Sequence, residues 1–462
     1  MHAQAGFRVD LRTGSAVGKA LSQRQHLKRN ISLIHLIGIE VGQSIGAGIF
    51  ALTGIALAAT GASLFLAFLA AAIPVALAMA VLAMLATAEP ISGGTYYYGS
   101  RLFSPVASFT GVWAYILGAV LGMFPLYALT GATFLKAVIP ALPKVPVALL
   151  LLALFFLTNL FGARIAIWVQ AVLVAVLLAA LFVFIGAGLR HVEVENFSPL
   201  FAEGSGGFLV ASAILTFTIL GANAAVELGD EIIDPRRNIP RSFLISIPVV
   251  TAIYLVIGIV AAGVAPWTSW SDTSLSNVAS TFLTGPAFVF FVVGGGFLAV
   301  VTTLNATYLW GTKSLIVITE DGLFPGALAR VNRRFGTPHW FLIIIFLISS
   351  LALIVVGERV QTFAVFASLG GIIIFIPVMG AALRLRKHHP ELYARSSIQL
   401  KGFFYFFAPA MGLLLCLLVI VILLIDLTSH ANGLIFLVIF IAWVAAGAAY
   451  SWVRMLRKRS RR

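Results

Sequence analysis

The chain has 462 residues, of which 61% are hydrophobic and only 10% are charged. These proportions exclude an ordinary soluble globular protein and indicate an integral membrane protein. A formal net charge of +14 would also suit a nucleic-acid-binding protein, but the Lys and Arg residues are spread over many short segments, so we expect no nucleic-acid partner.

The predicted elements begin with a basic, polar tail over residues 1–30, followed by apolar stretches long enough to cross a hydrocarbon core of about 30 Å. Twelve such stretches, with few or no charges, occupy residues 31–59, 62–88, 104–135, 146–163, 165–189, 208–228, 242–264, 286–312, 340–357, 360–383, 403–425 and 431–453. The pattern therefore predicts an all-α integral membrane protein with about 12 transmembrane helices.

Glycines interrupt the first and the sixth span, within residues 45–50 and 220–223. Unwound backbone inside a membrane is tolerated only where it is buried in protein or lines a cavity, so the two breaks predict a ligand site. Four unbroken spans separate them, which predicts two inverted repeats, over residues 31–190 and 208–384. We expect helices 11 and 12, within residues 403–453, to be peripheral and residues 454–462 to form a basic C-terminus.

The distribution of basic residues predicts the orientation of the chain. If the N-terminus is cytoplasmic, all but four of the 30 Lys and Arg residues fall in cytoplasmic segments, and the exceptions are Lys136, Lys144, Arg190 and Arg359. This positive-inside bias predicts that both termini are cytoplasmic. The short loops are typical of a protein of the bacterial inner membrane.

The two breaks are expected to have opposite electrostatic character. The second half of span 1 begins at its break, and a helix N-terminus has free N–H groups and a partial positive charge that attract a carboxylate. The first half of span 6 ends at the other break in free carbonyl groups, which attract a cation, so a zwitterion satisfies both ends. The glycines alone leave another interpretation open, because Gly38, Gly42 and Gly46 also form a small-residue ridge of the kind used in helix packing.

Four motifs occur in order along the chain: Gly46-Ala47-Gly48-Ile49-Phe50, Pro90-Ile91-Ser92-Gly93-Gly94-Thr95-Tyr96, and the segments 230–241 and 320–325. Together they resemble the amino acid–polyamine–organocation superfamily. The resemblance implies a five-plus-five fold of the leucine-transporter type with discontinuous helices 1 and 6, acting as a secondary active permease or exchanger of amino acids by alternating access. It also implies that N–H groups of Gly46, Ala47 and Gly48 hold the substrate carboxylate, and that carbonyl groups of Phe217, Thr218 and Ile219 hold the ammonium.

Further substrate contacts are expected from side chains and small residues around the breaks. The predicted set comprises Gln43, Ser44 and Ile49 in span 1 and Ile219, Gly221, Ala222 and Asn223 in span 6. Many relatives have an aromatic gate where Ile219 falls, and often an acidic residue where Asn223 falls. A neutral amide there favours neutral over basic amino acids as cargo.

Two carboxyl groups, Glu40 and Glu227, lie well inside apolar sequence, each six residues to the cytoplasmic side of a break, or about 9 Å along a helix. A buried carboxylate must be paired, bind a cation or be protonated. We therefore interpret the two as an inner gate or a proton-coupling pair. The alternative is that Glu227 only faces the cytoplasmic vestibule beside Asp230 and Glu231, paired with a loop arginine such as Arg101 or Arg237.

Thr302 and Thr303 in span 8 resemble the hydroxyls of a sodium-like pocket in this fold, although a Thr hydroxyl also bonds to the preceding turn of its own helix. Span 5 lacks the lysine found in some proton-coupled relatives, which leaves exchange, H⁺ and Na⁺ coupling all open. The prolines in residues 230–241 are expected to stop helix continuation there, and the alternating charges of this segment to lock the cytoplasmic face.

Other functions fit the sequence less well. A polyamine or other organic cation would require more carboxylates facing the cavity, and a non-transporting nutrient sensor of the same fold would not need the intact glycine break. An enzyme is not indicated, because the sequence shows no metal-spaced His or Cys cluster, phosphate loop or nucleophile set. We expect no cofactor and no metal site. The expected partners are an amino acid substrate and the lipid bilayer, and the sequence indicates no particular protein partner.

Overall fold

The structure is a computed structural model that describes residues 29–161, 167–269, 274–324, 332, 337–429 and 432–459. Of the basic tail predicted over residues 1–30, only Arg29 and Asn30 lie within this range, and residues 460–462 of the predicted C-terminus lie outside it. The regular structure of the described residues is helical, apart from one parallel bridge between Ile31 and Ile232.

The membrane helices agree in number with the prediction. Within the described residues, ten apolar helical stretches are long enough to cross a membrane, and the first, Leu33–Ala88, contains 56 residues. At 1.5 Å per residue that length suffices for two crossings. A further apolar helix, Lys144–Leu160, has 17 residues. The chain is therefore an all-α, multi-pass membrane protein with about 12 crossings.

The helices make up the spans in chain order. The first six spans contain α2 (Leu33–Ser44), α3 (Ala47–Thr60), α4 (Leu64–Ala88), α6 (Pro105–Gly118), α7 (Phe124–Val138), α8 (Lys144–Leu160), α9 (Ile167–Gly188), α10 (Gly204–Ile219) and α11 (Ala224–Glu227). The last six contain α12 (Pro235–Gly263), α14 (Gly285–Phe290), α15 (Leu298–Glu320), α16 (His339–Val356), α17 (Val360–Ile373), α18 (Ile376–His388), α20 (Phe403–Ser429) and α21 (Gly433–Arg459). Shorter helices between them are α5 (Gly94–Leu102), α13 (Leu275–Ser280) and α19 (Pro390–Arg395).

Two spans contain a π-helical segment, η2 (Ala119–Met123) between α6 and α7 and η8 (Phe291–Phe297) between α14 and α15. A π-helical turn bends a helix and is frequent at functional sites. These segments interrupt spans 3 and 8, which occupy the same position in the two predicted repeats.

Several helices extend beyond the predicted apolar stretches at one end. α15 continues to Glu320 and α21 to Arg459, because a charged residue ends an apolar window without ending the helix. The prediction that the prolines stop helix continuation in residues 230–241 was wrong for Pro240. Pro235 lies in the first turn of α12, where its missing N–H is not needed, and Pro240 lies inside the same helix.

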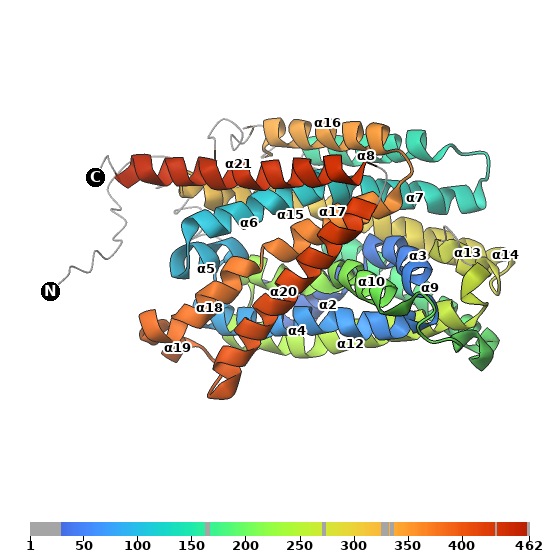
Figure 1. Ribbon diagram of the computed structural model, residues 1–462, viewed down its shortest axis with the longest axis horizontal. Coiled ribbons are helices and arrows are strands. Elements are labelled where there is room, and N and C mark those ends of the chain that lie inside the picture. The colour runs from blue at the N-terminus through green and yellow to red at the C-terminus, as the bar shows by residue number, and fades with distance from the viewer. Residues whose placement is uncertain are drawn as a thin grey trace.

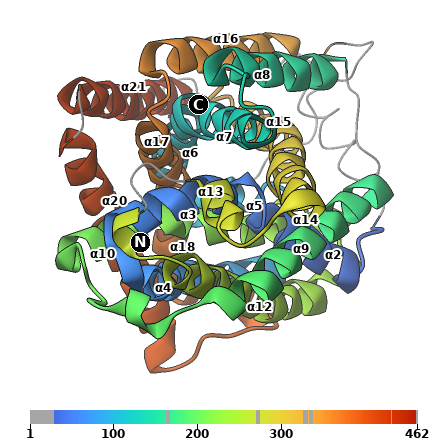
Figure 2. The ribbon, with the colours of Figure 1, turned by 90° about the vertical axis from the view of Figure 1, so that its right-hand side faces the viewer.

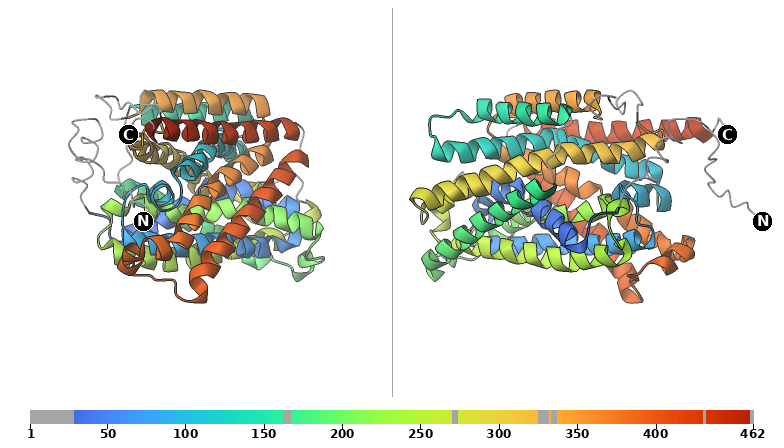
Figure 3. Two further views of the ribbon diagram at one scale, coloured as in Figure 1. Left: turned by 60° about the vertical axis from the view of Figure 1, so that its left-hand side comes forward. Right: turned by 180° about the vertical axis from the view of Figure 1, so that it is seen from behind.

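The helices form two outer layers with the broken spans between them. α4 and α12 lie side by side along one face, with α9 next to α12, and α8 and α16 lie together on the opposite face (Figures 1 and 2). α15 runs obliquely between these layers, as Figure 3 shows from behind. The unwound backbone of the breaks is enclosed by protein, since residues 44–47, 219, 220, 222 and 223 are buried.

Helices α20 and α21 lie at the periphery, as predicted. Only 28% and 17% of their most apolar windows are buried, against 89% for the span Val360–His388. α21 is attached to α6 by stacked indoles, since Trp113 and Trp443 have ring centroids 4.5 Å apart and each donates its N–H to the other's carbonyl oxygen. The outer faces of both helices are free to contact lipid.

Candidate functional site

The two helix breaks are in direct contact. α2 ends at Ser44 and α3 begins at Ala47, while α10 ends at Ile219 and is followed by the 3₁₀ segment η5 (Leu220–Asn223). A Cβ atom added to Gly221 would overlap the backbone N of Ser44 and lie 2.5 Å from the carbonyl C of Gln43. Only glycine permits so close an approach, so Gly221 joins the two unwound segments.

The N-terminus of α3 is capped from span 8. The Ala47 N–H donates to Thr303 Oγ1 at 2.9 Å, and a Cβ atom on Gly46 would overlap that oxygen. Gly46 has a φ of −104°, which any residue can adopt, so the contact with Thr303 and not the φ angle requires glycine here. Gly48 is different, because a Cβ there would make an ordinary contact of 3.6 Å with Thr218 Cγ2.

A tyrosine of span 7 meets the carbonyl ends at both breaks. The buried Tyr254 hydroxyl donates to the carbonyl oxygen of Ser44, and the carbonyl oxygen of Thr218 lies 3.3 Å away. One hydroxyl thus connects α12 to both broken spans. The sequence analysis missed Tyr254. The available signal was the spacing of four residues from Ser242 to Ser246 and of eight from Ser246 to Tyr254, which places polar groups on one face of α12.

A cavity of about 90 Å³ lies at the breaks. A water molecule needs roughly 10–15 Å³ on this scale, so the cavity accommodates a small ligand. Its lining comprises Gly42, Gln43, Tyr115, Met123, Tyr127, Phe217, Leu220, Gly221, Asn223, Thr302, Thr303, Thr307, Gly371 and Ile374. Each of these lining side chains, all from the part of the chain that the structure describes, is uncharged.

The structure divides the predicted site residues into two groups. Six of them line the cavity, namely Gln43, Phe217, Gly221, Asn223, Thr302 and Thr303. The others are not part of the lining: Ser44, Gly46, Ala47, Gly48, Ile49, Thr218, Ile219 and Ala222, together with Glu40 and Glu227. Ile219 is buried, and the aromatic ring near this position belongs instead to Phe217, which stacks on Tyr127 with centroids 6.3 Å apart.

Sequence reasoning missed the lining residues of spans 3 and 10. Tyr115, Met123 and Tyr127 come from span 3, and Gly371 and Ile374 come from span 10. These helices are apolar on all sides, so their sequence does not show which face points inward. Met123 lies in the π-helical segment η2, which becomes visible only in the structure.

The two membrane carboxyl groups have different partners. Glu40 is fully buried and lies 2.7 Å from Ser242 Oγ and 2.6 Å from Ser246 Oγ, both on α12. Glu227 is 3% exposed and accepts a long hydrogen bond of 3.4 Å from the Thr95 N–H at the start of α5. These bonds therefore direct Glu40 and Glu227 toward different elements of the fold.

Thr302 and Thr303, the two residues of the predicted sodium-like pocket, have different hydrogen-bond partners. The Thr302 hydroxyl donates to the Ala299 carbonyl oxygen one turn earlier in α15, which is the self-bonded alternative considered above. The Thr303 hydroxyl accepts from Ala47. In this conformation each hydroxyl thus has a protein partner.

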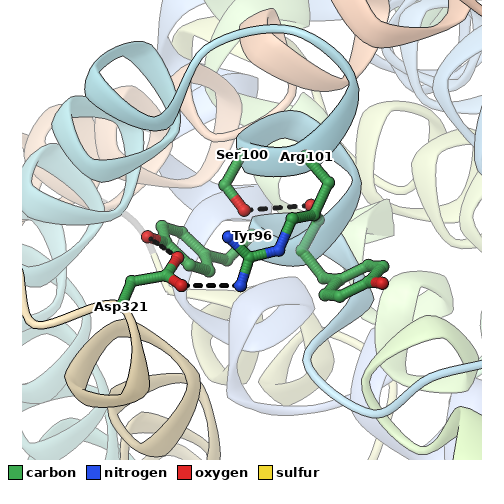
Figure 4. Close-up of polar contacts among 5 residues, drawn as sticks. Tyr96, Ser100, Arg101 and Asp321 are labelled. Carbon is green, nitrogen blue, oxygen red and sulfur yellow. Dashed lines mark hydrogen bonds and ion pairs between the residues drawn. The ribbon is translucent and has the colours of Figure 1, made fainter. Parts of the chain in front are cut away.

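An ion pair joins α5 to the end of α15 (Figure 4). Arg101 Nη2 lies 2.6 Å from Asp321 Oδ1, and the Tyr96 hydroxyl donates to Asp321 Oδ2 at 2.7 Å. Burial and the adjacent Asp321 carboxylate raise the pKa of Tyr96 well above its usual range, so Tyr96 remains a hydrogen-bond donor. Arg101 is therefore paired with Asp321, whereas the sequence alternative had paired it with a membrane glutamate.

The motifs after spans 2 and 6 are also bonded to each other. The Ser92 N–H donates to Asp230 Oδ2 at 3.0 Å, and the Asp230 N–H donates to Ser92 Oγ at 3.2 Å. A Cβ on Gly229 would lie 2.7 Å from the backbone N of Ile91, so the two loops pack closely. Both contacts hold this end of the molecule together next to the Arg101–Asp321 pair.

A sequence model of the family described as amino acid permease matches residues 31–446. The chain belongs to this family. The match includes both broken spans and all the cavity-lining residues, and it makes the protein a membrane transporter of amino acids and not an enzyme.

Three relatives match over most of their length. The chain is 27% identical to a methylthioribose transporter of Bacillus subtilis, with 81% of the chain and 85% of the relative covered. It is 25% identical to a branched-chain amino acid permease of Bacillus subtilis, over 81% and 84%. It is 30% identical to a probable GABA permease of Pseudomonas aeruginosa, over 78% and 81%.

Proposed function

We propose that this amino acid permease carries neutral amino acids as a secondary active transporter that works by alternating access. The observation that carries the proposal is the uncharged lining of the cavity at the contact between the breaks. A ligand with a charged side chain would lose its hydration there without an opposite charge in return. Asn223 lines this cavity as a neutral amide, which disfavours both cationic and anionic side chains.

We assign the zwitterionic part of the substrate to the backbone at the breaks. The N–H groups of Gly46, Ala47 and Gly48 would bind the carboxylate, and the carbonyl oxygens of residues 217–219 would bind the ammonium. Two hydroxyls make bonds of the same kind in this structure: Thr303 accepts from Ala47, and Tyr254 lies against the Thr218 carbonyl. In this proposal the substrate carboxylate replaces the Thr303 hydroxyl at the Ala47 N–H, and the substrate ammonium replaces the Tyr254 hydroxyl at the Thr218 carbonyl oxygen. These backbone groups therefore have a hydrogen-bond partner whether or not substrate is bound.

We further propose that residues 31–190 and 208–384 form two inverted repeats whose relative motion opens the cavity alternately to each side. The paired interruptions support this division, because spans 1 and 6 are unwound and spans 3 and 8 both contain π-helical segments. The Arg101–Asp321 pair and the Ser92–Asp230 bonds are contacts that must break for the cytoplasmic side to open.

We place the protein in the bacterial inner membrane with both ends of the chain in the cytoplasm. The excess of Lys and Arg in the segments assigned to that side supports this orientation. The bacterial sources of the relatives described above support the inner membrane. Labelling of a cysteine introduced at the exposed Arg454 with a membrane-impermeant thiol reagent tests the orientation, since the native Cys416 is buried. Labelling from the outside of intact cells would refute it.

Counterflow into proteoliposomes tests the substrate. Liposomes loaded with one unlabelled compound are mixed with trace amounts of the same compound in labelled form, using neutral, basic and acidic amino acids, GABA, a polyamine and methylthioribose. We expect saturable exchange of neutral amino acids and little exchange of arginine or glutamate. Exchange of basic amino acids, or of methylthioribose alone, would refute the assignment of neutral amino acids.

A further inference from the structure

The carboxyl group of Glu40 occupies an unusual position in the fold. It is fully buried on the half of span 1 assigned to the cytoplasmic side, and it does not line the cavity. Its hydrogen-bond partners are the hydroxyls of Ser242 and Ser246, four residues apart on α12. A fully buried carboxyl group held only by neutral hydroxyls is stable as a carboxylic acid and unfavourable as an ion.

The number of available hydrogens also favours a protonated group. Ser242 Oγ lies 2.7 Å from Glu40 Oε1 and 2.9 Å from the carbonyl oxygen of Ile239. A serine hydroxyl has one hydrogen, so it cannot donate fully to two acceptors. If Glu40 carries a proton on Oε1, it donates to Ser242, Ser242 donates to Ile239, and Ser246 donates to Oε2 at 2.6 Å. Every group then has a partner.

No neighbouring charge replaces that proton among the residues that the structure describes. The elements packed against α2 are chiefly α12, η5, α11 and α9, and η5 and α9 contain no titratable side chain. The titratable side chains of α2 and of the other two elements are His35, Arg236, Arg237, Arg241, Tyr254 and Glu227. Arg241 is one residue from Ser242 but exposed, and Tyr254 donates to Ser44 instead. Within the described part of the chain, Glu40 has no ion-pair partner.

The site is mechanically connected to the substrate break. Glu40 and Ser44 lie four residues apart on one face of α2 and contact α12 at two levels, Glu40 through the serines and Ser44 through Tyr254. If Glu40 lost its proton, Oε1 and the Ile239 carbonyl oxygen would both need the single hydrogen of the Ser242 hydroxyl, in a buried interface without water. Separation of α2 from α12, with entry of water, relieves that competition. The protonation state of Glu40 therefore biases the position of the inner half of span 1.

We propose that Glu40, together with Ser242 and Ser246, is the proton-binding site that couples amino acid transport to the proton gradient. The inference rests on the proposed transport function and names its coupling ion. Glu40 binds one proton while α2 is packed on α12. When the two helices separate, the Oε1–H bond breaks and the proton passes to a cytoplasmic water, which leaves a hydrated carboxylate.

The decisive variant is Glu40→Gln. Its amide N–H can donate to Ser242 and its carbonyl oxygen can accept from Ser246, so it reproduces the protonated group without titrating. Wild-type and variant proteoliposomes are compared in two assays with the membrane potential held at zero: counterflow, which needs no net proton movement, and accumulation under an inward gradient of about two pH units. One proton per substrate permits accumulation of up to about 100-fold in such a gradient.

We expect counterflow by Glu40→Gln within about twofold of the wild type, because Glu40 does not line the cavity, and complete loss of gradient-driven accumulation. Equal accumulation by variant and wild type would overturn the proton site. Accumulation by the wild type under a sodium gradient but not a pH gradient would overturn it as well, while leaving the proposed function intact. Absence of wild-type counterflow for every amino acid would instead refute the proposed function, and the coupling inference with it.

A second variant covers the case in which Glu40→Gln does not fold. Ser246→Ala removes one donor to the carboxyl group, and a hydrogen bond stabilises a carboxylate more than the neutral acid. The pH of half-maximal uptake should therefore rise by roughly half to one unit. Ser349→Ala is the matched control, because Ser349 is buried in α16 without a hydrogen-bond partner in the described structure. An unchanged midpoint in Ser246→Ala, or an equal shift in Ser349→Ala, would overturn the inference.

Discussion

Replacement of Gly46 by alanine should disable the transporter, whereas the same replacement at Gly48 should not, although both glycines belong to one motif. A Cβ at position 46 would overlap Thr303 Oγ1, so Thr303 must move and the Ala47 N–H loses its acceptor. Overpacking costs about 1–3 kcal/mol, and a buried donor left without a partner costs about 1–3 kcal/mol. The free energy of unfolding should therefore fall by roughly 2–6 kcal/mol.

At position 48 the same methyl group has room. Its nearest neighbour would be Thr218 Cγ2 at 3.6 Å, and alanine is up to about 1 kcal/mol more favourable than glycine inside a helix. Gly48→Ala should therefore keep the stability of the wild type or exceed it. It should also retain most of the counterflow activity, since alanine keeps the backbone N–H that the proposed function assigns to the substrate carboxylate.

The assay combines counterflow per folded transporter with unfolding in mixed detergent micelles. A double variant, Gly46→Ala with Thr303→Ala, removes the overlapping oxygen and should recover part of the packing energy lost in Gly46→Ala alone. Equal behaviour of the two single variants would refute the argument from contacts. So would loss of transport in a well-folded Gly48→Ala, because the added methyl group would then not have the room that the structure gives it.

Three further predictions concern the contacts around the site. Tyr254→Phe leaves the Ser44 carbonyl oxygen without its donor and should lower the free energy of unfolding by about 1–3 kcal/mol; an unchanged unfolding midpoint would contradict the role assigned to the hydroxyl. Asp321→Asn breaks the ion pair with the partly exposed Arg101, so we expect a stability loss of at most about 1 kcal/mol but faster thiol labelling of a cysteine placed at the neighbouring Tyr96. Labelling at the wild-type rate would show that this pair does not hold the face closed. Asn223→Asp adds a carboxylate to the uncharged cavity and should give measurable counterflow of basic amino acids; their continued exclusion would place Asn223 away from the substrate side chain.

The sequence by itself determined the class of protein, the approximate number of spans, both helix breaks and the family. These features are local, because a membrane requires about twenty apolar residues per crossing and satisfied backbone groups in each crossing. A glycine interruption such as that at Gly46 or Gly221 can therefore be recognised from the sequence without knowledge of the neighbouring helices. Glu40 could also be recognised from the sequence as a candidate functional residue. A charged carboxylate inside an apolar span is energetically costly, so its presence there indicates a role.

Only the tertiary structure decided which groups meet. Thr303 and Ala47 are 256 residues apart in the chain, and Ser242 and Glu40 are 202 apart, so no local pattern connects them. The same limit explains why the sequence grouped Glu40 with Glu227, whereas the hydrogen bonds of Glu40 run to α12. Helices that are apolar on every side carry no signal for their rotation. Their packing sets which faces line the cavity, and with that the chemistry of the site.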